Sequence, residues 1–143
     1  MSHDDFPFFH SLRVRWAEVD MQVIVFNGHY LTYFDVAFTE FWRTTGLPTP
    51  LEQSKEGREL FARRSGIEYL APARFDDALD VGMRCAHLGN SSMRIELAIF
   101  RGEEHLISSE LVYVYADAAE RKSVPIPAAW REVLMPAPVG AGA

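Results

Sequence analysis

One long helix with an apolar, mostly aromatic face is the feature that most restricts how this chain can fold. Between His29 and Thr45, apolar side chains recur at the i, i+3, i+4 and i+7 spacing of a helix face. Gly46 followed by Pro48 is typical of a helix end. Because so many rings need burial, we expect the rest of the chain to cover this helix. The face consists of Tyr30, Phe34, Ala37, Phe38, Phe41 and Trp42.

The segments around this helix mostly show the alternation of β-strands. Residues 11–17 alternate apolar and polar side chains, which predicts a strand before the helix. After the helix, Thr49-Pro50-Leu51-Glu52 has the form of a capping box and predicts a short second helix. Short turns between the later strands favour an antiparallel meander. The later strands are predicted near 60–71, 79–88, 92–101 and 105–116, and a final helical turn is predicted between Val124 and Leu134.

The order of these segments indicates the fold class. A strand, one apolar helix and four further strands predict an α+β fold, in which an antiparallel sheet wraps round the helix. The chain has 143 residues, a length that suits a single domain. We therefore predict one domain over 1–143, with a core of about 11–134 and a flexible tail over 135–143.

Charge and cysteine content argue against several classes of protein. The chain has 14 Lys and Arg against 20 Asp and Glu, a net charge of −6, which argues against a nucleic-acid partner. The single cysteine, Cys85, allows no internal disulfide and shows no zinc-binding spacing. The apolar run Val23–Phe26 is far shorter than a membrane span, and the acidic start lacks the features of an export signal. We expect a cytoplasmic protein without a membrane span.

The loop before the long helix is the best candidate for chemistry. Asp20 follows the first predicted strand and lies a few residues before the helix start at Asn27–His29. A helix N-terminus carries unpaired N–H groups and the positive end of the helix dipole, which can hold a developing oxyanion. A carboxylate just upstream would attack a carbonyl held there, or activate water against it. The alternative is that Asp20 only caps a turn, a common role of aspartate.

These residues resemble the signature of the 4-hydroxybenzoyl-CoA thioesterase-like family, which consists of hotdog-fold acyl-CoA thioesterases. The resemblance covers about residues 11–134, in the same order of elements. It implies a hotdog fold, hydrolysis of an acyl-CoA thioester to the free acid and coenzyme A, and a homodimer or homotetramer with the site between subunits. The segments that carry it are Arg15–Asp20, Val25–Ala37, Ile67–Asp77, Gly89–Ser92 and Val112–Asp117.

The resemblance also implies roles for individual residues. Asp20 takes the place of the catalytic carboxylate, as nucleophile or general base, and backbone N–H groups at Asn27 and Gly28 take the place of the oxyanion hole. The substrate is an acyl-CoA, or a thioester of an acyl carrier protein. Coenzyme A enters as part of the substrate, and neither a metal nor another cofactor is implied. The implied substrate-binding residues are His29, Tyr30, Asn90, Ser91 and Ser92.

Two positions depart from the family pattern. Val23 stands where the family usually has glycine, and a Cβ there would crowd the thioester or alter the loop backbone. Phe38 stands where the family often has arginine. The alternative function is therefore a non-hydrolytic hotdog protein that binds acyl thioesters. Glu40 is a second carboxylate candidate on the helix, and a solvated or interface-facing glutamate is the competing interpretation.

Overall fold

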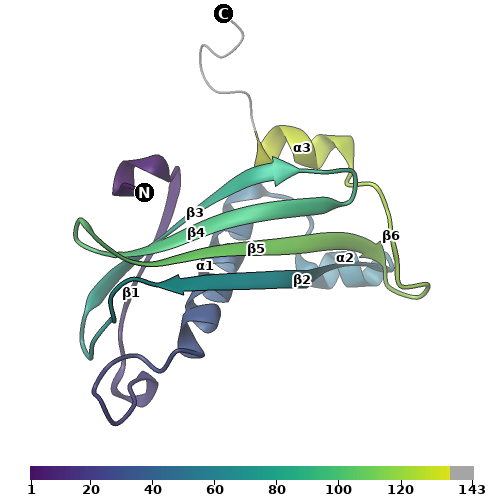
Figure 1. Cartoon of the computed structure of the whole chain (residues 1–143). Helices are drawn as coiled ribbons and strands as arrows, with labels where there is room; N and C mark the ends of the chain where they lie inside the picture. Colours follow the sequence, from purple (N-terminus) through teal and green to yellow (C-terminus); the bar gives the residue numbers. More distant parts are fainter. Residues whose placement is uncertain (136–143) are drawn as a thin grey trace, which may run out of the picture. The chain divides into compact units, whose positions relative to one another are not determined.

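Figure 1 shows the computed structural model of the chain, which describes residues 1–135. The long helix α1 has the bounds that the sequence predicted, and β2 to β5 lie within two residues of their predicted positions. The short helices α2 and α3 are confirmed as well. The elements in chain order are η1 (His3–Asp5), β1 (Phe8–Arg13), η2 (Trp16–Glu18), α1 (His29–Thr45), α2 (Pro50–Lys55), β2 (Arg58–Tyr69), β3 (Ala78–Leu88), β4 (Ser92–Arg101), β5 (Glu104–Asp117), β6 (Lys122–Ser123) and α3 (Ala128–Leu134).

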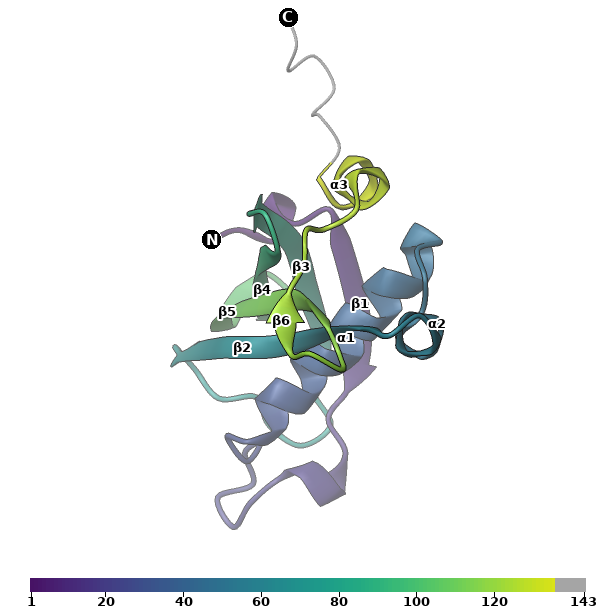
Figure 2. The same cartoon turned by 90° about the vertical axis from the view of Figure 1, so that its right-hand side faces the viewer.

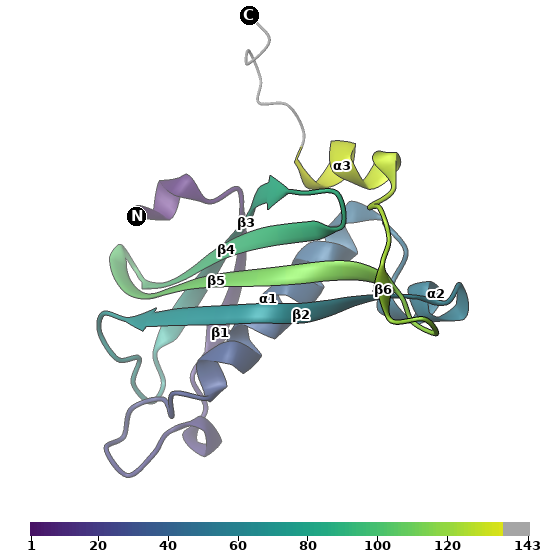
Figure 3. The ribbon, with the colours of Figure 1, turned by 45° about the vertical axis from the view of Figure 1, so that its right-hand side comes forward.

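The strands form one six-stranded sheet in the order β1-β3-β4-β5-β2, with β6 paired to β5 (Figure 3). The neighbours β3, β4 and β5 follow one another along the chain, which confirms the predicted meander. Strand β1 runs antiparallel to β3, from Phe8 opposite Met83 to Arg13 opposite Ala78. Strand β2 stands at the end of this order, so it is an edge strand. The pairing of β2 with β5 rather than with β3 was not predicted from the sequence.

The first strand is the main correction to the predicted elements. Alternation predicted a strand over 11–17, but β1 spans Phe8–Arg13. Its partner β3 begins at Ala78, opposite Arg13, so the chain beyond Arg13 has no strand residue to pair with. The chain turns into η2 instead, and Trp16 is 65% exposed rather than part of the core.

The described residues divide into two compact units, each with its own core. The first consists of Met1–Phe41, Gly66–Arg84 and Glu96–Glu110, and the second of Trp42–Ser65, Cys85–Ile95 and Leu111–Ala143, of which the structure describes residues up to Met135.

In the first unit, the first turns of α1 lie on one face of the sheet (Figure 2). Phe34 and Ala37 of the helix are fully buried there, as are Leu97 and Ile99 of β4. These four side chains follow the helix and strand periods, so both elements present a continuous apolar face. This packing fixes the N-terminal end of α1, which is the part that the candidate site uses.

The opposite face of the sheet in this unit is covered by the N-terminal segment. Phe6 packs on Ala98 and Phe100, which alternate with the residues that face the helix. A Cβ at Gly82 would lie 2.8 Å from Phe6 Cγ and 2.8 Å from Phe9 Cε1. Contacts that short do not occur between carbon atoms of this kind, so the close packing of Phe6 requires glycine at position 82.

The second unit has an aromatic core. The Trp42 and Trp130 rings are 5.4 Å apart, and the Tyr115 and Trp130 rings are 4.8 Å apart. This packing explains why α3 forms after Pro127. Helix α2 begins as predicted, because the Thr49 hydroxyl accepts a hydrogen bond from the Glu52 N–H at 3.2 Å.

Two further observations concern the described residues 1–135. None of their helices is long and apolar enough to cross a membrane. The predicted tail over 135–143 lies, apart from Met135, outside the described residues, and the single-domain organisation stays a prediction.

Candidate active site

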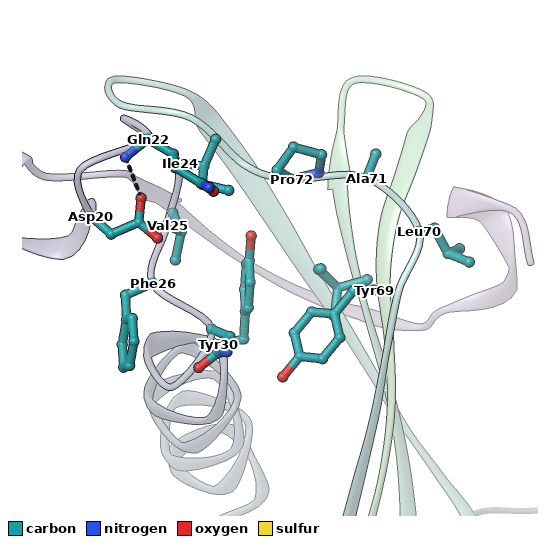
Figure 4. A pocket seen from close by; sticks show the side chains of 12 residues that line it. Asp20, Gln22, Ile24, Val25, Phe26, Tyr30, Tyr69, Leu70, Ala71 and Pro72 are labelled. Atoms are coloured by element: carbon teal, nitrogen blue, oxygen red, sulfur yellow. Dashed lines mark hydrogen bonds between the residues drawn. The ribbon is translucent and has the colours of Figure 1, made fainter.

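A pocket of about 440 Å³ opens at the N-terminal end of α1, within the first unit (Figure 4). One wall is the loop between η2 and α1, and the facing wall is the end of β2 with the segment that follows it. Asp20, Asn27 and Tyr30, three of the residues singled out in the sequence, therefore line one cavity. The lining residues are Asp20, Gln22, Ile24, Val25, Phe26, Asn27, Tyr30, Tyr69, Leu70, Ala71, Pro72 and Ile107.

Asp20 forms a tight turn and lines the pocket at the same time. Its Oδ1 accepts a hydrogen bond from the Gln22 N–H at 2.8 Å, drawn as the dashed line in Figure 4. Its own N–H donates to the Ile24 carbonyl, and its carbonyl accepts from the Val23 N–H, both at 2.9 Å. One carboxylate oxygen is thus held by the turn. The sequence offered turn capping and chemistry as alternatives, and this geometry is compatible with both together.

Val23 adopts a backbone conformation that is costly for its residue type. Its φ of 62° lies in the left-handed region, which a β-branched residue rarely enters. Val23 is 46% exposed, so packing of its side chain does not offset this cost. The conformation is instead held by the hydrogen bonds of the Asp20 turn. The glycine usual at this position in the resembling family would adopt it without strain.

Replacing Val23 with glycine is expected to stabilise the protein. The release of left-handed strain exceeds the extra chain entropy of glycine by about 1 kcal/mol. For a chain of this length that is a rise of about 3 °C in the midpoint of thermal unfolding, measured by calorimetry. Val23→Ala is the matched control, since it keeps the Cβ and should gain much less. An equal gain in both variants would contradict the strain argument.

The helix start next to this loop is a β-turn in which two backbone N–H groups have no acceptor in the protein. The His29 N–H donates to the Phe26 carbonyl at 2.9 Å, so Asn27 and Gly28 are the two central residues of the turn. Gly28 does not have a positive φ, which favours a type I turn. Among the described residues, neither the Asn27 N–H nor the Gly28 N–H donates to a protein acceptor. The turn therefore leaves donors for a bound group at the helix N-terminus.

Tyr30 joins the helix start to the facing wall. In Figure 4 its ring stands between the loop that carries Asp20 and the Tyr69 side chain. The hydroxyl of Tyr30 accepts a hydrogen bond from the Ala73 N–H at 3.0 Å, and the Ala73 carbonyl accepts from the Val25 N–H at 2.9 Å. Burial raises the pKa of Tyr30 above its ordinary value. The hydroxyl is therefore a neutral structural acceptor that keeps both walls in place.

The remaining residues that the resemblance singled out lie outside this pocket lining. His29 is half-buried, with its ring edge-on to the Phe26 ring at 5.8 Å, and Gly28 is exposed. The turn Gly89–Ser92 belongs to the second unit. Arg131 Nη2 donates there to the carbonyls of Gly89 and Asn90, at 2.7 and 3.0 Å. Substrate contacts by Asn90, Ser91 and Ser92 stay a prediction.

Sequence reasoning missed the facing wall and the buried acid Glu18. Tyr69 to Pro72 face the Asp20 loop next to an isolated antiparallel bridge between Ile24 and Arg74 and a hydrogen bond from the Ala73 N–H to Tyr30, pairings without a local sequence signal. Glu18 is 7% exposed, and neighbouring hydrogen-bond donors stabilise its ionised carboxylate. Burial acts to raise the pKa of Glu18, but hydrogen bonds from Arg15 and Tyr33 outweigh it, so the pKa lies below its ordinary value.

The described residues contain no group of three or more His, Cys, Asp or Glu side chains placed to hold a metal ion. The polar groups that the pocket offers are the carboxylate of Asp20, the amides of Gln22 and Asn27, the tyrosine hydroxyls and backbone N–H groups. A carboxylate that lines the same cavity as a free helix-start amide is an arrangement that can attack or hydrate a carbonyl carbon and hold the oxyanion that results.

Comparisons with known proteins agree with this chemistry. Residues 22–108 match the model of the family described as the Thioesterase superfamily. The acyl-CoA thioester hydrolase YbgC of Escherichia coli O157:H7 is 25% identical over 117 residues, which are 81% of this chain and 87% of that protein. A relative from Aquifex aeolicus is 30% identical over 95 residues, 66% of this chain and 73% of its own length.

Solved structures share the fold. The crystal structure of a hypothetical protein from Aquifex aeolicus superposes with a TM-score of 0.82 at 26% identity, covering 90% of this chain and 99% of that chain. A 1,4-dihydroxy-2-naphthoyl-CoA thioesterase from Synechocystis superposes with a TM-score of 0.83 at 20% identity, covering 89% of this chain and 94% of that chain. The α+β hotdog fold and the family resemblance inferred from the sequence are both confirmed.

Proposed function

Because this chain belongs to the Thioesterase superfamily and is a thioester hydrolase, we propose that it cleaves acyl-CoA thioesters in the pocket that Asp20 and Asn27 line. The observation that carries the proposal is that Asp20 and Asn27, whose backbone N–H has no protein acceptor, line a single cavity at the helix start. The names of the relatives support coenzyme A as the thiol. Ile24, Leu70 and Ile107 give the cavity apolar surface against which an acyl group would pack.

The proposed reaction needs only groups of this chain and water. The thioester carbonyl oxygen accepts hydrogen bonds from the helix-start amides at Asn27 and Gly28, which polarise the carbonyl carbon. As general base, Asp20 takes a proton from water, and the water oxygen attacks that carbon. The C–S bond then breaks, and the coenzyme A sulfur leaves with the proton. As nucleophile, Asp20 attacks the carbon itself, the C–S bond breaks, and coenzyme A leaves as a thiolate that takes a proton from water. A second water then hydrolyses the mixed anhydride, which releases the free acid and restores the Asp20 carboxylate. Coenzyme A is part of the substrate, and no metal or redox group takes part.

We also propose that the working form contains at least two copies of the chain. Edge strand β2 has one strand neighbour among the described residues, and most of its side chains are exposed, including Phe61 at 42% and Tyr69 at 55%. Long exposed edges of this kind are a template for pairing with another chain. Light scattering should give at least twice the 16.2 kDa of one chain, and a monomer mass would contradict this proposal.

The function is tested by a thiol-release assay over a panel of substrates. The panel holds short, long, branched and aromatic acyl-CoAs, and acyl carrier protein loaded with the same acyl groups. We expect release of coenzyme A from at least one acyl-CoA, with kcat/KM above that for the matching carrier-protein thioester. Faster turnover of the carrier-protein thioesters would change the proposed substrate class. Absence of turnover across the panel would contradict the proposal.

A further inference from the structure

Glu18 is a buried, charged side chain for which the proposed reaction has no use. All four hydrogen bonds to its carboxylate come from two residues. Oε1 accepts from the Arg15 N–H at 2.7 Å and from the Tyr33 hydroxyl at 2.9 Å. Oε2 accepts from Arg15 Nε at 3.3 Å and from Arg15 Nη2 at 3.0 Å. A carboxylate taken out of water is costly unless it is paired and hydrogen-bonded in this way.

Stability alone is a weak reason for such an arrangement. The Arg15 side chain is 78% exposed, and an ion pair with one partner in solvent is screened by water and contributes little to stability. The hydrogen bond from Tyr33 is different, because both partners are buried and it joins two separate elements. We therefore look for the role of Glu18 in the two elements that its hydrogen bond with Tyr33 joins.

Glu18 connects the loop that carries Asp20 to the body of α1. Its side chain is bound by Tyr33 in the second turn of the helix. Its backbone carbonyl accepts from the Phe26 N–H at 3.0 Å, and the next residue, Val19, forms an isolated bridge with Val25. Residues 18–26 are thus closed into a small hairpin, and Glu18 fastens this hairpin to the helix.

We propose that Glu18 is a positioning residue, which through Tyr33 fixes the Asp20 carboxylate relative to the helix-start amides at Asn27 and Gly28. The inference rests on the proposed function of this pocket. An attacking group and an oxyanion hole must meet the same carbonyl carbon, and a displacement of about 1 Å can cost 10²-fold in rate. The hairpin also contains the strained Val23, a conformation that persists only where surrounding contacts impose it.

The test compares two variants of the connection with a matched control. Tyr33→Phe removes one hydroxyl, and Glu18→Gln replaces a carboxylate oxygen with a donor that faces Arg15. Glu96→Gln is the control, because Glu96 also accepts two bonds from one arginine, Arg84 Nε at 3.0 Å and Nη2 at 2.6 Å, and is partly buried outside the pocket. Kinetics with the best substrate of the panel give kcat and KM separately.

We expect kcat to fall about 10- to 100-fold in Glu18→Gln and in Tyr33→Phe, with KM within about twofold of wild type. The double variant should lose no more than the worse single variant, because both act through one connection. Glu96→Gln should keep the wild-type kcat. A wild-type kcat in both test variants, or a rise in KM alone, would overturn the inference. If Glu18→Gln does not fold, Tyr33→Phe decides.

Hydrogen exchange supplies a readout that does not depend on turnover. Peptides covering residues 19–30 should exchange faster in Glu18→Gln and Tyr33→Phe than in wild type, and at the wild-type rate in Glu96→Gln. Unchanged exchange in both test variants would overturn the positioning role. This result can be obtained whether or not the protein hydrolyses a thioester. If Asp20→Asn abolishes turnover but Tyr33→Phe leaves it at the wild-type rate, the proposed function stands and only this inference fails.

Discussion

Replacing Asp20 with asparagine is expected to lower kcat about 10²- to 10⁴-fold without unfolding the protein. The substitution removes the basic, nucleophilic carboxylate from the pocket. It keeps an oxygen where Asp20 Oδ1 accepts from the Gln22 N–H, so the turn around Val23 should persist. The acyl-CoA panel assay measures the rate, and calorimetry measures the midpoint of thermal unfolding.

Asp5→Asn is the matched control for this experiment. The Asp5 carboxylate also accepts one backbone N–H at 2.8 Å, from Ser2, but it does not line the pocket. A normal rate in Asp5→Asn together with a large loss in Asp20→Asn would assign the loss to the carboxylate in the pocket. If Asp20→Asn keeps its rate, Asp20 is a turn residue only and the proposed chemistry is wrong.

The parts of the fold that sequence predicted well are those fixed by local chemistry. Helix α1 follows from a row of rings at helical spacing and from Gly46, which has a φ of 72° just after the helix. Helix α2 follows from the Thr49–Glu52 capping box. Strand β4 has the predicted bounds because its alternation ends at turns on both sides. In each case the signal lies within a few residues of the element that it specifies.

The parts that sequence missed depend on residues far along the chain. Alternation continues through Trp16, but β1 ends at Arg13 because its partner strand ends there. The wall formed by Tyr69–Pro72 faces the Asp20 loop next to the bridge between Ile24 and Arg74. The spacing of apolar and polar residues in a segment does not show which distant strand it will pair with. Nor does it show which distant segment will face it across a pocket.

The candidate site falls between these two cases. Asp20 and the helix start are neighbours in sequence, so pattern and resemblance identified both. Glu18 carries no such signal, because an acidic residue beside a strand end is expected in solvent. Only the fold places it against Tyr33, where its charge is retained. The residues proposed to react were thus predictable, while the residue proposed to position them was not.

A proline at position 27 is expected to lower kcat about 10²- to 10³-fold, since it deletes one proposed oxyanion donor. Asn27 is the second residue of the turn closed by the His29 N–H and the Phe26 carbonyl, a position where proline is favoured. Proline supplies a carbonyl, so the bond from the Tyr30 N–H to residue 27 can persist. The variant therefore removes an amide hydrogen from the pocket while the turn and α1 keep their geometry.

Asn27→Ala separates this effect from loss of the asparagine side chain, because alanine keeps the amide hydrogen. We expect Asn27→Ala to retain most of the wild-type kcat and Asn27→Pro to lose it, with similar midpoints of thermal unfolding. The same test does not suit Gly28, since proline is disfavoured as the third residue of a type I turn. If the two Asn27 variants have equal rates, this amide does not hold the oxyanion. The Gly28 N–H, the other helix-start amide without a protein acceptor, would then be the next candidate donor.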